Sequence, residues 1–226
     1  IPAQVRAADI PGDGGGTLIT MTIGGNDLRT ERGENWPDAL LRCITSVGCD
    51  GSTENRMANL DEIRRDLIET YVAIGDEYPG IMVRALGYPR LMQSDRWCEG
   101  VTGVGRDEAD FIDEQADLLN REVQAAAIVA RARTGADIRY VSVIDEFDNH
   151  GACRFWQRDR YINDAVFGES LRRSELADGT IREYRTDTLL NVSSASFHPS
   201  SSGYDAYLEA LRSSVEPRVA ATADAR

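Results

Sequence analysis

Short apolar strand patterns alternate with long amphipathic helix patterns along most of this chain. The β-branched run of residues 17–23 lies between two glycine clusters and predicts a buried strand. Residues 81–86 and 138–144 predict two more strands, and apolar residues three or four positions apart predict helices in residues 55–74 and 112–130. Because parallel strands need long crossover connections, this alternation predicts an α/β fold with a parallel sheet covered by helices on both faces.

The pattern is weaker in the rest of the chain. The polar residues 145–196 predict loops with short helices, residues 204–211 predict a closing helix, and residues 217–226 predict a frayed tail. A length of 226 residues suits one hydrophobic core, so we expect a single domain. The sequence holds no apolar run of the roughly 20 residues that a membrane-spanning helix needs, and we expect no transmembrane segment.

The charge of the chain excludes several function classes. It carries 38 acidic and 25 basic residues, and the net charge of −13 repels phosphate backbones, so nucleic acid is not an expected partner. Every basic residue is arginine. Without lysine, P-loop phosphate binding and Schiff-base catalysis are both excluded.

Four cysteines indicate the compartment in which the chain works. Their spacing, at Cys43, Cys49, Cys98 and Cys153, does not fit a zinc site, and we expect no metal. An even count without metal spacing favours disulfides and a secreted protein, and the alternative is four buried free thiols. The chain opens at Ile1 without methionine or a signal peptide, which predicts a processed product.

Two sequence positions favour catalytic chemistry. His198 is one of only two histidines and lies on a loop ahead of a predicted helix, where doubly wound folds present catalytic groups; a surface or capping histidine is the alternative. The first strand leads into Gly24-Gly25-Asn26-Asp27. The glycines allow a sharp turn, and the Asn26 amide can then serve as an oxyanion donor, although the same letters are common in ordinary turns.

Four segments together carry a family resemblance: TLITMTIGGND, ALGYP, FDNHGAC and SFHPSSSGYDAYLEAL. They resemble the SGNH (GDSL-type) hydrolases, specifically the secreted actinobacterial esterase and lipase branch, from about residue 17 to about residue 211. The resemblance implies a three-layer αβα sandwich with a flavodoxin-like parallel sheet, and carboxylic ester hydrolysis by acyl transfer without a cofactor. It also implies that Asn26 and Gly24 are oxyanion donors and that His198 is the general base.

The resemblance further implies two disulfides, Cys43 with Cys49 and Cys98 with Cys153. One departure from the family pattern is Ala195, which stands where the family usually has the aspartate that orients the histidine. The backbone carbonyl of Ala195 can accept the Nδ1–H of His198 instead, which fixes the tautomer without adding negative charge.

The larger departure is the missing Gly-Asp-Ser nucleophile block. Residues Gly12-Asp13-Gly14 have glycine where the serine would stand. We therefore expect the first two strands and the nucleophile to come from a missing amino-terminal segment or a companion chain, with these residues forming about three quarters of the domain. Residues 17–23 then become an edge strand that invites association with that segment.

Other residues are weaker candidates. Ser170, in Gly168-Glu169-Ser170, is the nearest local match to the nucleophile block, and Asp145 or Asp148 is a possible acidic partner for His198. His150 is expected to support a disulfide loop. Serines near His198 are expected to be loop hydrogen-bonders and the tryptophans to pack under loops or line an acyl pocket: Ser193, Ser194, Ser196, Trp36, Trp97 and Trp156. The alternative function is a catalytically degenerate domain that binds a lipid, glycan or protein.

Overall fold

The computed structural model describes residues 5, 8–45, 53–93, 104–153, 160–163, 171–175, 181–185 and 198–215. Its centre is a parallel three-stranded sheet in the order β1-β2-β3. The strands are β1 (Leu18–Met21), β2 (Met82–Leu86) and β3 (Asp137–Val141). All three fall within the predicted segments or one residue outside them, which confirms the parallel α/β prediction.

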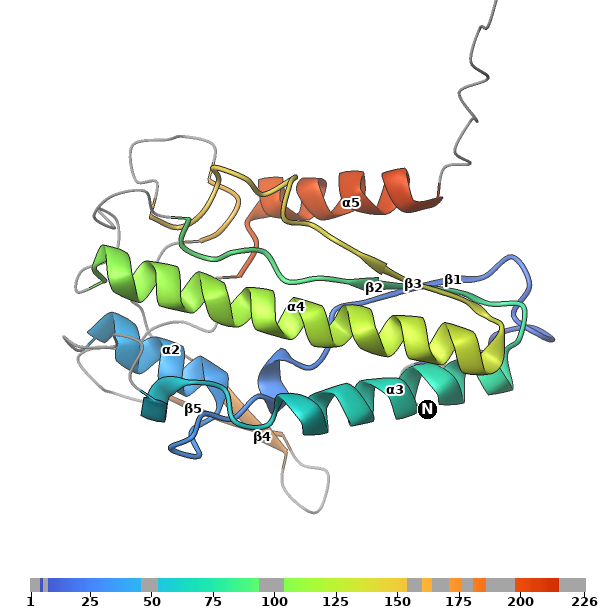
Figure 1. The fold of residues 1–226 in the computed structure, drawn as a ribbon, viewed down its shortest axis with the longest axis horizontal. Coiled ribbons are helices and arrows are strands. Elements are labelled where there is room, and N and C mark those ends of the chain that lie inside the picture. Colours follow the sequence, from blue (N-terminus) through green and yellow to red (C-terminus); the bar gives the residue numbers. More distant parts are fainter. Residues whose placement is uncertain are drawn as a thin grey trace, which may run out of the picture.

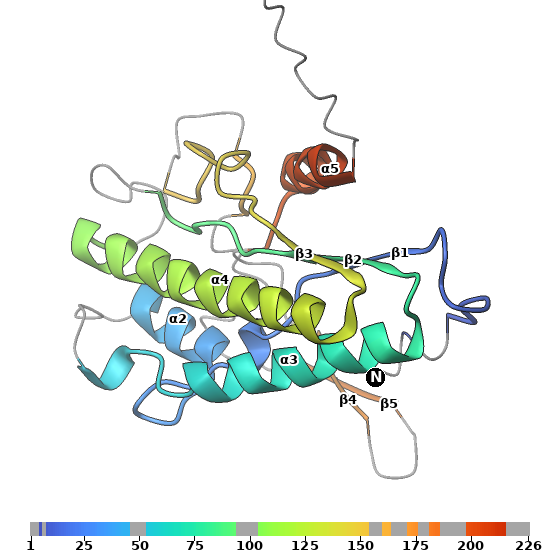
Figure 2. The same ribbon diagram turned by 45° about the vertical axis from the view of Figure 1, so that its right-hand side comes forward.

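Helices cover the sheet in two layers. α3 (Leu60–Glu77) and α4 (Arg106–Thr134) lie on one face, and α5 (Ser201–Val215) lies on the other (Figure 1). The view turned by 45° keeps the same three layers (Figure 2). α4 ends at Gly135, whose φ of 75° is the left-handed conformation that favours glycine at a helix end. The fold is therefore the predicted αβα sandwich.

β1 is an edge strand in the described part of the chain. It pairs with β2 on one side, and none of the described strands pairs with its other side. Ile19 and Met21 pack toward the core between the sheet and α3, whereas Leu18 is 37% exposed. An open edge with an exposed leucine is the arrangement expected for a strand that lacks one neighbour.

Several elements differ from the sequence prediction. The helix predicted from residue 55 begins at Leu60, because residues 53–55 form the 3-10 turn η2 (Thr53–Asn55). A further helix, α2 (Trp36–Thr45), was not predicted. The prediction of loops and short helices for residues 145–196 is wrong at β4 (Leu171–Glu175) and β5 (Ile181–Arg185), which form an antiparallel hairpin. An Asp178-Gly179 pair between two five-residue strands is the signal that this prediction overlooked.

Candidate active site

A glycine-rich turn follows β1 at the carboxyl edge of the sheet. This glycine turn (residues 24–27) contains the 3-10 helix η1 (Gly25–Asp27). Gly24 has a φ of 106°, and a Cβ there would meet only side-chain atoms at 3.5 Å or more. The backbone angle rather than crowding therefore requires glycine. The Asn26 side chain is exposed, and its amide makes no hydrogen bond to any described residue.

Hydrogen bonds from the side chains of Asn59 and Arg29 hold the later part of the glycine turn. Asn59, which precedes α3, donates its Nδ2 to the Asp27 carbonyl at 3.0 Å and accepts the backbone N–H of Arg29 at 2.8 Å. The Arg29 guanidinium donates to the Asn26 carbonyl at 3.0 Å. These bonds use the backbone of the turn, so the Asn26 carboxamide is left to interact with a ligand.

Tyr88, which lies two residues after β2, holds the glycine end of the turn. Its hydroxyl accepts the backbone N–H of Gly25 at 2.9 Å. Asn120 on α4 fixes the backbone of Tyr88 with two hydrogen bonds, accepting its N–H at 2.7 Å and donating to its carbonyl at 2.8 Å. Burial raises the pKa of Tyr88, which keeps the phenol neutral at physiological pH. A Cβ on Gly25 would lie 3.0 Å from the Tyr88 ring, so a larger residue there would push the ring away by a few tenths of an ångström.

His198 is exposed and lies directly ahead of α5. Its backbone carbonyl accepts the N–H of Asn163 at 3.0 Å. Two residues later, Ser200 donates its N–H to the Tyr161 carbonyl at 2.8 Å and its hydroxyl to the Arg160 carbonyl at 3.0 Å. The histidine segment (residues 198–200) is thus hydrogen-bonded along its length to residues 160–163.

The support of the histidine segment continues to the second histidine. The His150 ring stacks on the Tyr161 ring, with centroids 3.8 Å apart and planes 5° apart. The His150 carbonyl also accepts the Tyr161 N–H at 3.0 Å. Gly203 allows α5 to begin against this support, because a Cβ there would lie 2.2 Å from the Tyr161 carbonyl oxygen. His150 therefore supports residues 160–163, and through them His198.

One side chain ties α5 to the residues that follow β2. The Tyr207 hydroxyl donates to the Gly87 carbonyl at 3.0 Å. Gly87 directly precedes Tyr88, which holds the glycine turn, so α5 is fastened to the carboxyl end of β2 beside that turn. The two predicted site elements, the turn of Asn26 and the segment of His198, consequently belong to the same edge of the sheet, where doubly wound folds place their ligands.

The other predicted site residues divide into two groups. Asp145 and Asp148 are exposed after β3, and Asp148 accepts a hydrogen bond from the neighbouring Asn149 at 2.8 Å. Trp36 is half-buried at the start of α2 and packs against the core. The remaining candidates lie outside the described residues: Ala195, Ser170, Ser193, Ser194, Ser196, Trp97 and Trp156. The prediction of a frayed tail at residues 217–226 also falls outside them.

The two described cysteines are both buried. Cys43 on α2 is 1% exposed and Cys153 is 7% exposed, and neither is a free thiol. This argues against four free thiols. Their predicted partners, Cys49 and Cys98, lie outside the described residues, so the pairing stays a prediction.

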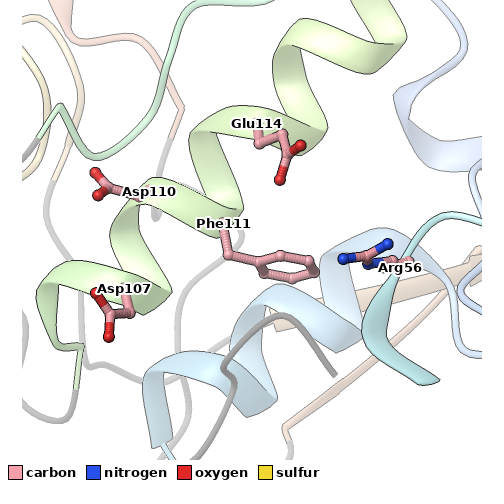
Figure 3. Close-up of a pocket in the computed structure, with 5 residues that line it drawn as sticks. All are labelled: Arg56, Asp107, Asp110, Phe111 and Glu114. Carbon is pink, nitrogen blue, oxygen red and sulfur yellow. The ribbon is translucent and has the colours of Figure 1, made fainter. Parts of the chain in front are cut away.

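A separate hollow lies at the start of α4. Its volume is about 440 Å³, and Figure 3 shows Phe111 and Arg56 pointing toward one another beside three carboxylates of α4. These carboxylates belong to Asp107, Asp110 and Glu114. Neither Asn26 nor His198 lines it. Within the described residues no cluster of side chains fits a metal ion, and no helix is long and apolar enough to cross a membrane.

The fold is shared with two lipolytic enzymes from Streptomyces. Phospholipase A1 from Streptomyces albidoflavus NA297 superposes with a TM-score of 0.54 and 22% sequence identity, over 93% of this chain and 74% of that enzyme. The extracellular lipase from Streptomyces rimosus gives a TM-score of 0.53 and 21% identity, over 87% of this chain and 68% of the lipase. No family model and no curated protein matches the chain. The resemblance inferred from the sequence is thus confirmed at the level of the fold.

Proposed function

We propose that this chain is part of a serine-type carboxylic ester hydrolase of the lipase and esterase class. The observation that carries the proposal is the attachment of both site elements to the residues that follow β2. α5, which follows His198, is bonded to Gly87 through Tyr207, and the glycine turn is bonded to Tyr88. The Asn26 amide is free of hydrogen bonds to the described residues and exposed at that edge. The two solved structures that share the fold are both lipolytic enzymes, which supports the same reaction class.

In the proposed reaction, a serine hydroxyl attacks the ester carbonyl while His198 takes its proton. The Asn26 amide and the Gly24 backbone N–H donate to the oxyanion that forms. The tetrahedral intermediate then expels the alcohol, which receives the proton from His198, and leaves an acyl-serine ester. Water attacks this ester while His198 takes its proton, and the second intermediate releases the acid as His198 returns the proton to the serine. The Ala195 carbonyl holds the Nδ1–H of His198, so the base works in a dyad.

The nucleophilic serine belongs, in this proposal, to a segment outside the 226 residues. The sequence contains no Gly-Asp-Ser block, and the outer side of β1 is open within the described part of the chain. A strand added beside β1 would pair its free backbone groups and cover Leu18. If the added strand runs parallel to β1, as β2 does, its carboxyl end would lie beside the glycine turn. We also propose that the protein is secreted, as the extracellular lipase with the same fold is.

The experiment is labelling of the native preparation with a fluorescent fluorophosphonate, followed by intact-mass analysis of every polypeptide. We expect one labelled serine on a polypeptide segment outside these 226 residues, and no label after heat denaturation. Label on Ser170 would instead place the nucleophile within this chain. Absence of any label, together with no hydrolysis of p-nitrophenyl butyrate, would contradict the proposal and favour a binding module.

A further inference from the structure

The first described part of the β2–α4 loop (residues 87–93) contacts the supports of both halves of the candidate site. At its start, the Tyr88 hydroxyl accepts the N–H of Gly25 in the glycine turn. At its end, the Gln93 side chain accepts the N–H of His150 at 3.1 Å. Between them, the Leu91 carbonyl accepts the N–H of Ala152 at 2.8 Å. These seven residues therefore lie between the turn of Asn26 and the residues that support His198.

Two buried polar residues fasten this loop to α4. Asn120 is 6% exposed and holds the backbone of Tyr88, as described above. Asp113 is 8% exposed and accepts the N–H groups of Met92 at 2.8 Å and Gln93 at 2.7 Å. Residues seven apart lie on the same side of a helix, so α4 presents both groups to the loop. Residues 87–93 are thus fixed at two points by one straight, 29-residue helix.

The hydrogen bond from the Gly25 N–H to the Tyr88 hydroxyl connects this loop to the proposed oxyanion donors. Gly25 lies between Gly24 and Asn26, the two proposed oxyanion donors, and the turn has no Cβ at residues 24 and 25 to restrict its backbone. Asn59 and Arg29 hold carbonyl groups at the later end of the turn. The Tyr88 hydroxyl is the side-chain acceptor for an N–H group at its glycine end.

We propose that Tyr88 is a positioning residue, which holds Gly24 and Asn26 in the geometry that receives the oxyanion. The proposal rests on the proposed ester hydrolase function for its kinetic consequence, but not for its structural one. Removing the hydroxyl leaves the ring packing intact and frees the Gly25 N–H. The glycine turn then samples other conformations, and the oxyanion donors lose alignment in the transition state while substrate binding is unchanged.

The first test is amide hydrogen exchange of Tyr88→Phe, read on peptides that cover residues 22–28. The matched control is Tyr71→Phe. Tyr71 is a fully buried tyrosine in the same core, where Tyr88 is half-buried, and its hydroxyl has no hydrogen-bond partner among the described residues. We expect exchange of Gly25 and Asn26 to become about fivefold to tenfold faster in Tyr88→Phe alone, as loss of one hydrogen bond implies. Equal exchange in wild type and Tyr88→Phe would overturn the proposal whatever the protein catalyses.

The second test is steady-state ester hydrolysis by the complete native enzyme that carries each change. We expect kcat to fall about fivefold to tenfold in Tyr88→Phe with KM within twofold, and no change in Tyr71→Phe. A rise in KM with unchanged kcat would overturn the positioning role. If His198→Ala retains full activity, the proposed function fails, while the exchange experiment still decides whether Tyr88 holds the turn.

Discussion

The glycine turn after β1 and the histidine segment before α5 belong to the same sheet edge, but they are supported differently. The glycine turn is bound by side chains: Asn59, Arg29 and the Tyr88 hydroxyl. The histidine segment is bound to residues 160–163 mainly by backbone hydrogen bonds, to which the Ser200 hydroxyl adds one, and these residues are bound in turn to His150. A turn held by side chains changes when one side chain is replaced, whereas backbone pairing survives most substitutions.

Because of this difference, we expect substitutions to affect the glycine turn and the histidine segment differently. The donors of the glycine turn depend on several individual side chains that are distant in sequence, so substitutions far from Asn26 reach it. The placement of His198 depends on a short backbone pairing with residues 160–163, and the imidazole itself is the group that matters there. Substitutions at the reacting groups should therefore have large effects in both halves, and substitutions in their supports should separate them.

The largest effect is expected from His198→Ala. Without a base to take the serine proton, kcat should fall at least about 10⁴-fold while KM stays within a few fold. The measurement is hydrolysis of p-nitrophenyl butyrate by the complete enzyme, with the exposed Asp205→Ala on α5 as a control that keeps full activity. A His198→Ala variant with wild-type turnover would show that the histidine segment is not part of the active site.

A smaller loss is expected from Asn26→Ala. The turn backbone keeps its bonds to Arg29 and Tyr88, so the change removes one oxyanion donor and kcat should fall about 10²–10³-fold. Asn26→Asp should lose at least as much, because a carboxylate has the same shape but no donor. The His198→Ala/Asn26→Ala double variant should lose less than the product of the two effects if both groups act on one transition state. If the two losses in kcat multiply in full, Asn26 and His198 do not act on the same transition state.

The sequence predicted the parts of this arrangement that are encoded locally. The three strands of the parallel sheet follow from apolar runs, and the turn of Gly24 follows from glycines directly after a strand. The bond between Gly25 and Tyr88 joins residues 63 positions apart, and no local pattern shows it. The one available signal was the placement of Asp113 and Asn120 on the apolar side of a helix, since a buried polar group needs a hydrogen-bond partner.

The last prediction concerns stability rather than turnover, at the part of the β2–α4 loop that supports the histidine half. Burial raises the pKa of Asp113 to about 6 from 3.8, against the lowering effect of the Met92 and Gln93 N–H groups and of Arg90; Asp117 raises it further. Between about pH 4 and pH 6 the folded protein therefore keeps a proton that the unfolded chain has lost. The free energy of unfolding should fall across this window as pH rises, by up to about 3 kcal/mol from this group.

Urea unfolding of wild type and Asp113→Asn at pH 4, 5, 6 and 7 isolates this contribution, because the other carboxylates are common to both proteins. The stability of wild type relative to the variant should decrease as pH rises to about 6 and then level off. Asn120→Ala is the matched change at the other end of the loop. Asn120 is a neutral amide that does not titrate, so its substitution should cost the same free energy of unfolding at every pH.

A difference in stability between wild type and Asp113→Asn that is constant with pH would mean that Asp113 is already ionised at pH 4. In that case, its two backbone hydrogen bonds outweigh its burial, and the supports of the two halves of the site respond alike to pH.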